Sequence, residues 1–235
     1  MMLKAGVVLA GWLLAMVPFG AATAQTQPVV VELYTSQGCS SCPPADAFLA
    51  ELADRDDVIA LSLHVDYWDY IGWKDVFGRP ENTARQKNYA HAAGSRSIYT
   101  PQMVIAGQEQ IAGFRPMEVS DAIMEHFRHP APVSVTLTRK GTMLHIAARS
   151  DAPLGRSAVI QLVRYRPKGT VEITRGENRG RTISYRNVVT DWRALGRWGG
   201  SEALEHEVSL SGQDPVVVIV QEEGFGPILG AARLR

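Results

Sequence analysis

"TSQGCSSCPPAD", residues 35–46, contains both cysteines of the 235-residue chain, Cys39 and Cys42. It follows "PVVVELY" (28–34), whose β-branched and apolar residues predict a buried strand. After Cys42, apolar residues recur at the spacing of one helix face: Ala45, Phe48, Leu49 and Leu52. The cysteine pair is therefore predicted to lie between a strand and a helix, at the first turn of the helix.

A cysteine pair with this spacing suits three roles. As a structural disulfide it would close a loop of four residues, which stabilises a fold by only about 2 kcal/mol, against about 4.7 kcal/mol for a 100-residue loop. Zinc needs four ligands, so two thiols better suit a copper site completed by one histidine, with His64 as the candidate. As a redox pair, Cys39 would lie at the positive end of the helix, which stabilises a thiolate. Cys39 would then attack and Cys42 would resolve the mixed disulfide. The redox role is favoured, and the other two stay open.

The first half of the chain is predicted to alternate strands and helices. A second strand is expected at 58–65, helices at 81–93 and 116–128, and a hairpin at 102–114 between those helices. After the second strand comes a long segment rich in aromatic and acidic residues, 66–79, called the aromatic insertion below. The predicted order is strand, helix, strand, helix, hairpin, helix.

The sequence changes character near residue 130. Helical periodicity nearly vanishes, and short strand candidates follow one another at the spacing typical of an antiparallel sandwich. The segment "DWRALGRWGG" (191–200) is predicted to be a loop or one helical turn between strands. We therefore expect two domains, residues 26–130 and 131–235, of which the second is an all-β antiparallel sandwich.

The predicted first domain resembles the thioredoxin superfamily. The resemblance rests on the cysteine pair at the start of the first helix, the later hairpin and final helix, and "YTPQMVI" (99–105). It implies a fold class of an α/β thioredoxin-like domain followed by the all-β sandwich domain. In thioredoxin-like proteins a cis-proline faces the cysteines. The resemblance implies that role for Pro101, with Thr100 before it and a peptide-binding edge beside them.

A closer resemblance extends over nearly all of the chain after its N-terminal segment. The stretches "VVELYTSQGCSSCPPAD", "HVDYWDYIGWKD", "YTPQMVI" and "RGENRGRTISYRNVV" are similar to the bacterial exported proteins grouped as domain of unknown function 1223. This likeness implies a thioredoxin-like fold and gives no substrate. Gly38 replaces the tryptophan before the first cysteine of thioredoxin, and Ser40-Ser41 replace its Gly-Pro, so no reduction potential is implied.

Other candidate residues flank the cysteine pair. Glu32 lies in the strand that matches the one carrying a buried aspartate in thioredoxin, so it is a candidate proton relay; alternatively it faces solvent or pairs with a lysine or arginine. In the aromatic insertion, Tyr67, Trp68 and Trp73 could line a substrate groove, or the rings could form a satellite core. The segment "RGENRGR" (175–181) could hold an anion or be a solvated hairpin turn.

The N-terminus and the charge balance limit which compartment and which classes of partner are expected. Residues 1–24 have a basic start, an apolar run and Ala22-Thr23-Ala24, which together predict a secretory signal peptide. The alternative is an uncleaved membrane anchor, for which the apolar run is short. The mature protein is expected to be periplasmic or secreted, where cysteines tend to pair. With 24 basic and 24 acidic side chains and no basic block, the chain is not expected to bind nucleic acid. No cofactor is expected, nor a membrane span after signal removal.

The expected function is thiol–disulfide exchange with exported protein thiols or small thiols. Cys39 and Cys42 would react, Glu32 would relay the proton, and Pro101 would shape the peptide-binding edge. Two alternatives stay open: a non-enzymatic binding or assembly module with an inert disulfide, and a copper-handling protein.

Overall fold

The structure is a computed structural model that describes residues 27–129 and 131–235. The predicted signal peptide, residues 1–24, lies outside the described residues. Within the described ranges, no helix has the length and apolar character needed to cross a bilayer.

The elements before residue 130 follow the predicted order. They are β1 (Val29–Thr35), α1 (Pro43–Ala53), β2 (Val58–His64), α2 (Pro80–Ala92), β3 (Gln102–Ile105), β4 (Glu109–Ala112) and α3 (Pro116–Arg128). A short 3₁₀ turn, Asp69–Ile71, lies in the aromatic insertion. Each α-helix begins with a proline at its first turn, where the missing N–H has no intrahelical partner to lose.

The elements after residue 130 are all strands. They are β5 (Val133–Lys140), β6 (Met143–Ser150), β7 (Ala158–Glu172), β8 (Thr182–Trp198), β9 (Leu204–Ser209), β10 (Val216–Glu222) and β11 (Ile228–Leu234). The prediction of a loop or helical turn at 191–200 was wrong, because β8 continues to Trp198. Two register shifts in its pairing with β7 insert extra residues into β8, and such bulges break the alternation by which a strand is recognised.

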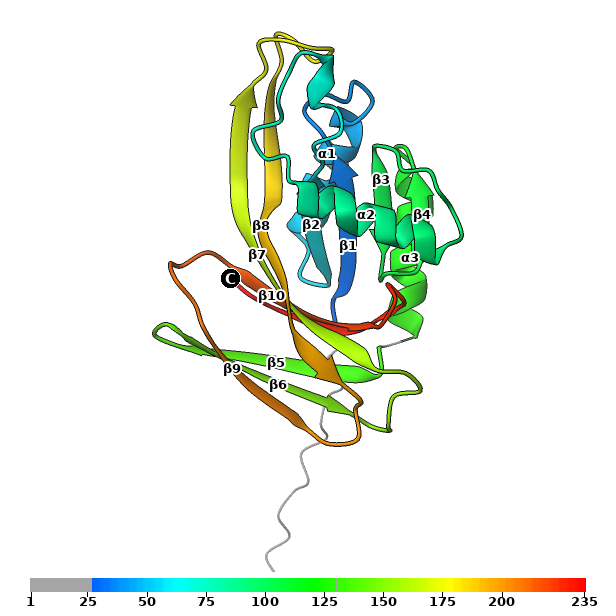
Figure 1. Cartoon of the computed structure of the whole chain (residues 1–235), viewed down its shortest axis with the longest axis vertical. Coiled ribbons are helices and arrows are strands. Elements are labelled where there is room, and N and C mark those ends of the chain that lie inside the picture. Colours follow the sequence, from blue (N-terminus) through cyan, green and yellow to red (C-terminus); the bar gives the residue numbers. More distant parts are fainter. Residues whose placement is uncertain (1–26, 130) are drawn as a thin grey trace, which may run out of the picture.

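The predicted fold class, an α/β thioredoxin-like domain followed by an all-β sandwich, was wrong. One mixed eight-stranded sheet runs through both halves of the chain in the order β11-β10-β7-β8-β2-β1-β3-β4, and a separate sheet contains only β5, β6 and β9. The junction is a parallel pairing of β2 with β8 at Ser62 and Val188. In Figure 1 the long β7–β8 hairpin rises beside β2. Whether residues 26–130 and 131–235 fold as separate units stays a prediction.

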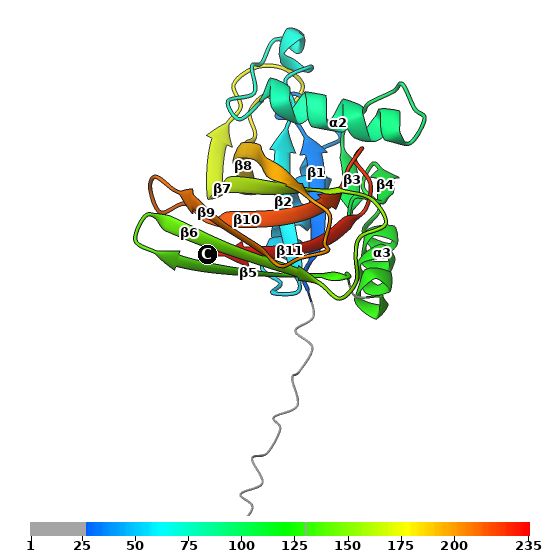
Figure 2. The same cartoon turned by 60° about the horizontal axis from the view of Figure 1, so that its bottom comes forward.

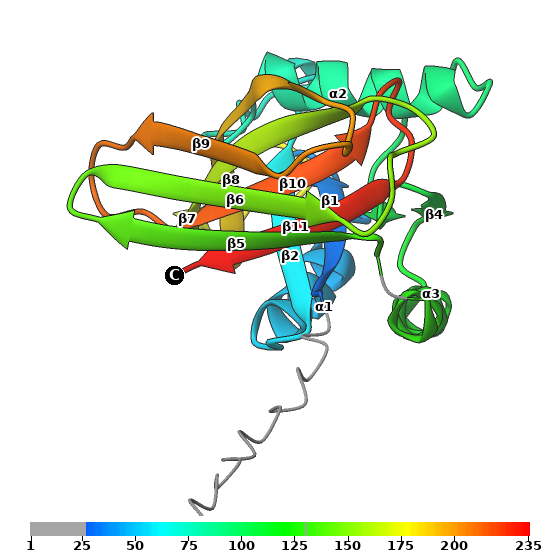
Figure 3. The same cartoon turned by 90° about the horizontal axis from the view of Figure 1, so that it is seen from below.

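The error has a physical cause. Alternating hydrophobicity identifies a strand and the face that it buries, but it does not identify the neighbouring strand. β7 and β8 have 15 and 17 residues, which lets one hairpin serve both parts of the molecule. Its lower part pairs with β10 and packs against the three-stranded sheet, which crosses in front of β10 and β11 in Figure 2 and lies over them in Figure 3. Its upper part extends the sheet of the first half.

The two faces of the β1–β2 pair are covered by different helices. Val30 and Tyr34 of β1 belong to the core that contains Tyr89 of α2, whereas Val31 and Leu33 belong to the core formed with α1 and α3. Every residue of β1 is buried, as expected for a central strand covered on both faces. Side chains along a strand alternate between its faces. A polar side chain on β1 or β2 is therefore buried on one face of the pair, either the face toward α2 or the face toward α1 and α3.

Candidate functional site

Cys39 and Cys42 form a disulfide at the start of α1, with their Cα atoms 5.4 Å apart. Cys42 is the residue that caps the helix, and the N–H of Cys39 donates to the carbonyl of Ser36 over 3.1 Å. Cys39 is 3 % exposed and Cys42 is 0 % exposed. Cys39 is thus the more accessible of the two sulfur residues, by a narrow margin. Residues 36–42, the cysteine loop below, are covered by other segments.

The aromatic insertion supplies part of this cover. The side-chain oxygen of Gln37 accepts hydrogen bonds from Trp73 Nε1 over 2.8 Å and from the N–H of Val76 over 3.3 Å. The N–H of Gln37 donates to Asp75 Oδ2 over 2.8 Å. Gly38 lies so close to the insertion that a Cβ placed on it would be 3.1 Å from Trp68 Cβ. The glycine at position 38 therefore leaves room for this segment.

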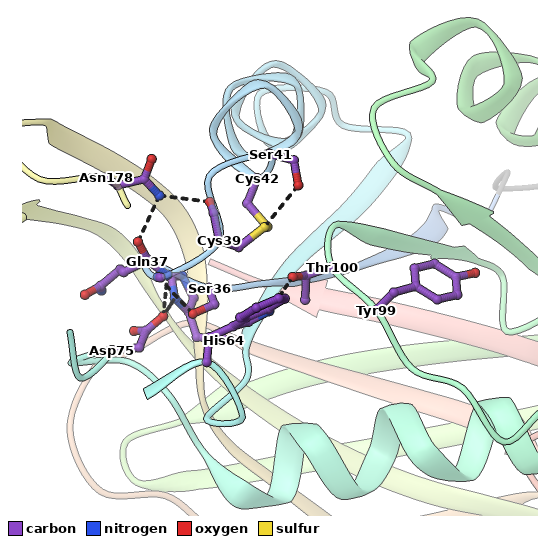
Figure 4. The surroundings of a disulfide bond; sticks show 12 residues. Ser36, Gln37, Cys39, Ser41, Cys42, His64, Asp75, Tyr99, Thr100 and Asn178 are labelled. Carbon is purple, nitrogen blue, oxygen red and sulfur yellow. Dashed lines mark hydrogen bonds and ion pairs between the residues drawn. A yellow bond between two sulfur atoms is a disulfide. The ribbon is translucent and has the colours of Figure 1, made fainter. Parts of the chain in front are cut away.

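The turn between β7 and β8, residues 173–181, supplies the rest of the cover. Asn178, which is buried, donates from Nδ2 to the carbonyl oxygens of Gln37 and Cys39 over 2.9 and 2.8 Å (Figure 4). Gly176, at φ +73°, lies against Trp73, and a Cβ there would be 3.1 Å from Trp73 Cβ. Sequence reasoning weighed the arginines of this turn and missed the asparagine. The sequence shows an asparagine in a glycine-rich turn, and this pattern does not identify the carbonyl groups to which its side chain donates.

The predicted cis bond at Thr100–Pro101 is confirmed. Thr100 lies among the residues that surround the disulfide (Figure 4), and its Oγ1 accepts a hydrogen bond from Trp68 Nε1 over 2.8 Å. The carbonyl of Pro101 accepts a bond from the N–H of Gly113 over 2.8 Å. The segment before β3 and the aromatic insertion are therefore fastened to each other beside the cysteine loop.

Glu32, the predicted proton relay, has a full set of partners away from the cysteines. Its carboxylate accepts from Arg85 Nε over 2.7 Å and Nη2 over 2.8 Å, and from the hydroxyls of Tyr34 and Tyr89 over 2.9 and 2.8 Å. Glu32 shares its side of β1 with Tyr34, which faces α2. The structure thus agrees with the alternative reading, pairing with an arginine, and does not bring Glu32 to the cysteine pair.

A second group of buried polar side chains does border the cysteine loop. His64 Nδ1 lies 2.8 Å from Asp75 Oδ2. Burial raises the pKa of Asp75, but His64 and the backbone N–H groups of Gln37 and Phe77 outweigh that effect, so this pKa stays below its ordinary value. An ionised Asp75 accepts, so Nδ1 of His64 carries the proton. Asp46 of α1 is also buried, and burial raises its pKa to about 7.

Similarity to known proteins agrees with this architecture. A family model described as "Protein of unknown function (DUF1223)" matches residues 30–221. The chain belongs to the DUF1223 family. The X-ray crystal structure of protein AGR_C_4864 from Agrobacterium tumefaciens is similar, with 30 % sequence identity and a TM-score of 0.78, covering 90 % of this chain and 96 % of that one. A search of curated proteins finds no match. The resemblance to DUF1223 read from the sequence is confirmed, and it brings no activity with it.

Tyr67, Trp68 and Trp73 were predicted to bind substrate. In this DUF1223 protein they make hydrogen bonds and packing contacts with other parts of the chain. Trp68 and Trp73 donate to Thr100 and Gln37, and Tyr67 donates to Gln86 Oε1 of α2 over 3.2 Å. Tyr67 and Trp68 also pack against the core on the α2 side. Tyr70, at 80 % exposure, is the large aromatic ring that the insertion presents to solvent. The satellite-core reading therefore describes Tyr67 best, and Trp68 and Trp73 cover the cysteine loop.

His64, the candidate copper ligand, already uses Nδ1 for Asp75 in the DUF1223 protein. In the part of the chain that the structure describes, no group of three His, Cys, Asp or Glu side chains has an arrangement that could hold a metal ion. The two sulfurs are joined to each other, so neither is a thiolate ligand in this state.

Proposed function

We propose that this DUF1223 protein carries out thiol–disulfide exchange through Cys39 and Cys42 in a periplasmic or secreted setting. The observation that carries the proposal is the Cys39–Cys42 disulfide at the N-terminal end of α1. The unpaired N–H groups and dipole at a helix start stabilise the thiolate of the first cysteine. A relationship to the thioredoxin superfamily stays a prediction.

The exchange begins from the oxidised protein. A thiolate of an exported dithiol protein, or a small thiol, attacks Cys39 Sγ. The Cys39–Cys42 bond breaks, and its electron pair leaves on Cys42 Sγ. A second partner thiolate then displaces Cys39 from the mixed disulfide. The partner dithiol is thereby oxidised to a disulfide, and the cysteine pair is reduced.

The low exposure of both cysteines favours a second candidate, a binding or assembly module whose disulfide is inert. The two candidates differ in the reactivity of reduced Cys39. Under the exchange proposal, reduced Cys42→Ser protein should form a mixed disulfide with oxidised glutathione roughly tenfold faster at pH 7 than a free peptide cysteine, because its thiolate is stabilised. Cys39→Ser is the matched control, since Cys42 is the fully buried sulfur residue.

Mass spectrometry of quenched samples measures both rates. A Cys42→Ser protein that reacts no faster than the free peptide would exclude the exchange proposal and leave the inert disulfide. A glutathione redox titration of the native pair then gives its reduction potential, and with it the direction of electron flow against a chosen partner.

A further inference from the structure

The residues behind Cys42 provide a proton route that differs from the one expected from the sequence. We propose that Asp46 donates a proton to the Cys42 sulfur when the disulfide opens and takes one back when the disulfide closes. This inference rests on the proposed function, because it describes a step of the same exchange.

The need for a donor follows from the burial of Cys42. When an attacking thiolate opens the disulfide, the electron pair of the broken bond leaves on Cys42 Sγ. Cys42 is 0 % exposed, so the thiolate forms out of reach of bulk water. An unpaired charge in an apolar interior is costly, and burial in apolar surroundings raises a thiol's pKa. A neighbouring group that can give up a proton removes this cost.

Asp46 is placed for this role by the helix. Its N–H bonds to the carbonyl of Cys42 over 3.1 Å, which puts the two residues four apart on one helix face, with Cβ atoms about 5–6 Å from each other. Asp46 is 4 % exposed, and neither of its carboxyl oxygens has a well-formed hydrogen bond among the described residues. A buried carboxyl group without a firm donor is more stable protonated. Burial accordingly raises the pKa of Asp46 to about 7.

His64 lies on the same face of β2 as Val58 and Ala60, which pack in the core formed with α1. Asp75 fixes its ring through Nδ1, which leaves Nε2 buried and without a partner within the described ranges. His64 and the nearby Thr35 hydroxyl lower the pKa of Asp46 against the larger effect of burial, whereas Asp75 raises it. A doubly protonated imidazole donates from Nε2 to the carboxylate that Asp46 becomes, whereas a neutral imidazole with its proton on Nδ1 can only accept there from the protonated carboxyl group.

Two further buried polar groups lie beside His64. Thr35 lies beside His64 in the β1–β2 register, and the ring of Tyr185 in β8 packs edge-on against His64 with centroids 4.6 Å apart. Thr35 Oγ1 and the Tyr185 hydroxyl are both buried, and the described part of the chain gives neither a well-formed hydrogen bond. We call Thr35, Asp46, His64 and Tyr185 the buried chamber. The groups that face Asp46 are thus His64 and Asp75, with the neutral hydroxyls of Thr35 and Tyr185.

Atoms and electrons balance in this step. The attacking thiolate becomes part of the mixed disulfide on Cys39, Cys42 Sγ receives the electron pair and then the Asp46 proton, and Asp46 is left as a carboxylate beside His64. Asp46 then takes a proton from solvent, so opening the disulfide takes up one proton overall. Closing reverses both steps, and Asp46 returns that proton to solvent before it accepts the one from Cys42. Glu32 cannot play this part, because its four hydrogen bonds are all made on the α2 side of β1.

The test measures single-turnover reaction of the oxidised protein with reduced glutathione, expressed per glutathione thiolate, at pH 6 and pH 8. Asp46→Asn should lower the rate at pH 6 by about 100-fold, the low end of the range for general acid catalysis. At pH 8 the difference should shrink, because Asp46, with a pKa of about 7, is then largely ionised in the wild-type protein as well. Glu51→Gln, an exposed carboxylate on the same helix, is the matched control and should react like wild type.

The dependence of the wild-type rate on pH is a second readout, and it does not depend on whether any variant folds. The wild-type rate per thiolate should fall as the pH rises through about 7, because the donor loses its proton at its pKa. A flat profile, or Asp46→Asn matching Glu51→Gln at both pH values, overturns the inference and leaves the proposed function standing. No reaction with glutathione at either pH would instead remove the proposed function, and the inference with it.

Discussion

The two faces of the β1–β2 pair each enclose a group of polar side chains, and the groups are built in opposite ways. On the α2 side, Arg85 and Glu32 form a short ion pair, and Arg85 also donates to Gln161 and Gln221 over 3.2 and 3.1 Å. Its guanidinium stacks on the Trp192 ring at 3.8 Å. On the α1 side, all four members of the buried chamber keep polar atoms without a well-formed hydrogen bond in the described structure.

The contrast separates a structural role from a chemical one. The Arg85 group connects side chains of β1, α2, β7, β8 and β10, so it holds the two halves of the chain together. The Glu32 carboxylate is held in place by four donors. The Asp46 carboxyl group has no such set of donors and is free to change its state, one helical turn from the cysteine pair.

The largest effect should come from breaking the Arg85 group. Arg85→Met leaves Glu32 buried without its cation, which we expect to cost about 3–5 kcal/mol of stability. Urea unfolding followed by tryptophan fluorescence measures it. Adding Glu32→Gln should recover part of the loss, because the buried charge is then gone. A loss below about 1 kcal/mol for the single variant would contradict the structural role.

Replacing Asp46 in the buried chamber should raise the stability of the protein at alkaline pH, whereas replacing Arg85 should lower it. In the folded protein the pKa of Asp46 is raised from its ordinary 3.8 to about 7, so the unfolded chain releases this proton first. The stability that Asp46 contributes should fall by roughly 1.4 kcal/mol for each pH unit between about pH 4 and pH 7, and stay low above pH 7. Asp46→Asn should therefore stabilise the protein at pH 8, and less so at pH 4. Unfolding curves at both pH values test this, and equal effects would contradict it.

A smaller effect is expected at the turn that covers the cysteine loop. Asn178→Ala removes both hydrogen bonds to the carbonyls of Gln37 and Cys39, which we expect to cost about 1–3 kcal/mol. Reduced Cys39 should also become faster to alkylate, since its loop is less firmly held. Arg179→Ala, exposed in the same turn, is the control. If the two variants alkylate at the same rate, the turn does not control access to Cys39.

The smallest effect concerns Trp68. Trp68→Phe keeps an aromatic ring and the Cβ that lies near Gly38 but removes the donor to Thr100 Oγ1, a loss of about 0.5–1.5 kcal/mol. Reduction of the disulfide by a water-soluble phosphine should accelerate modestly, because the aromatic insertion is then less fastened to the segment before β3. A rate that does not change would show that this hydrogen bond does not limit access to the sulfurs.

Local patterns predicted the elements around the cysteine pair well. The buried strand, the helix opened by Pro43, and the hairpin after Pro101 all follow from residue spacing over short windows. The pairing of β2 with β8 did not follow, because its register joins Ser62 to Val188 across more than half the chain. The fold class failed at that step, since one long-range pairing decides whether two sheets are separate or continuous.

The cysteine pair of the candidate site was named from the sequence, and its long-range surroundings were not. Glu32 and Thr35 are three residues apart on β1 and so face opposite sides of it, and only the Thr35 side meets α1. The choice of Glu32 as the proton relay therefore placed the expected carboxylate on the face of β1 that points away from α1 and the cysteine pair. Asp46 is visible in the sequence beside the cysteines, but its lack of firm partners is a property of the folded interior.

Asn178 has a consequence for the order of events during synthesis. It reaches back 139 residues to the Cys39 carbonyl, so the cysteines leave a ribosome or an export channel long before the side chain that holds their loop. In that interval the thiols are open to oxidants, and the cover closes only after the β7–β8 turn has emerged. A fragment that ends at residue 130 would preserve this early, open stage, and its chemistry would describe a nascent chain rather than the finished protein.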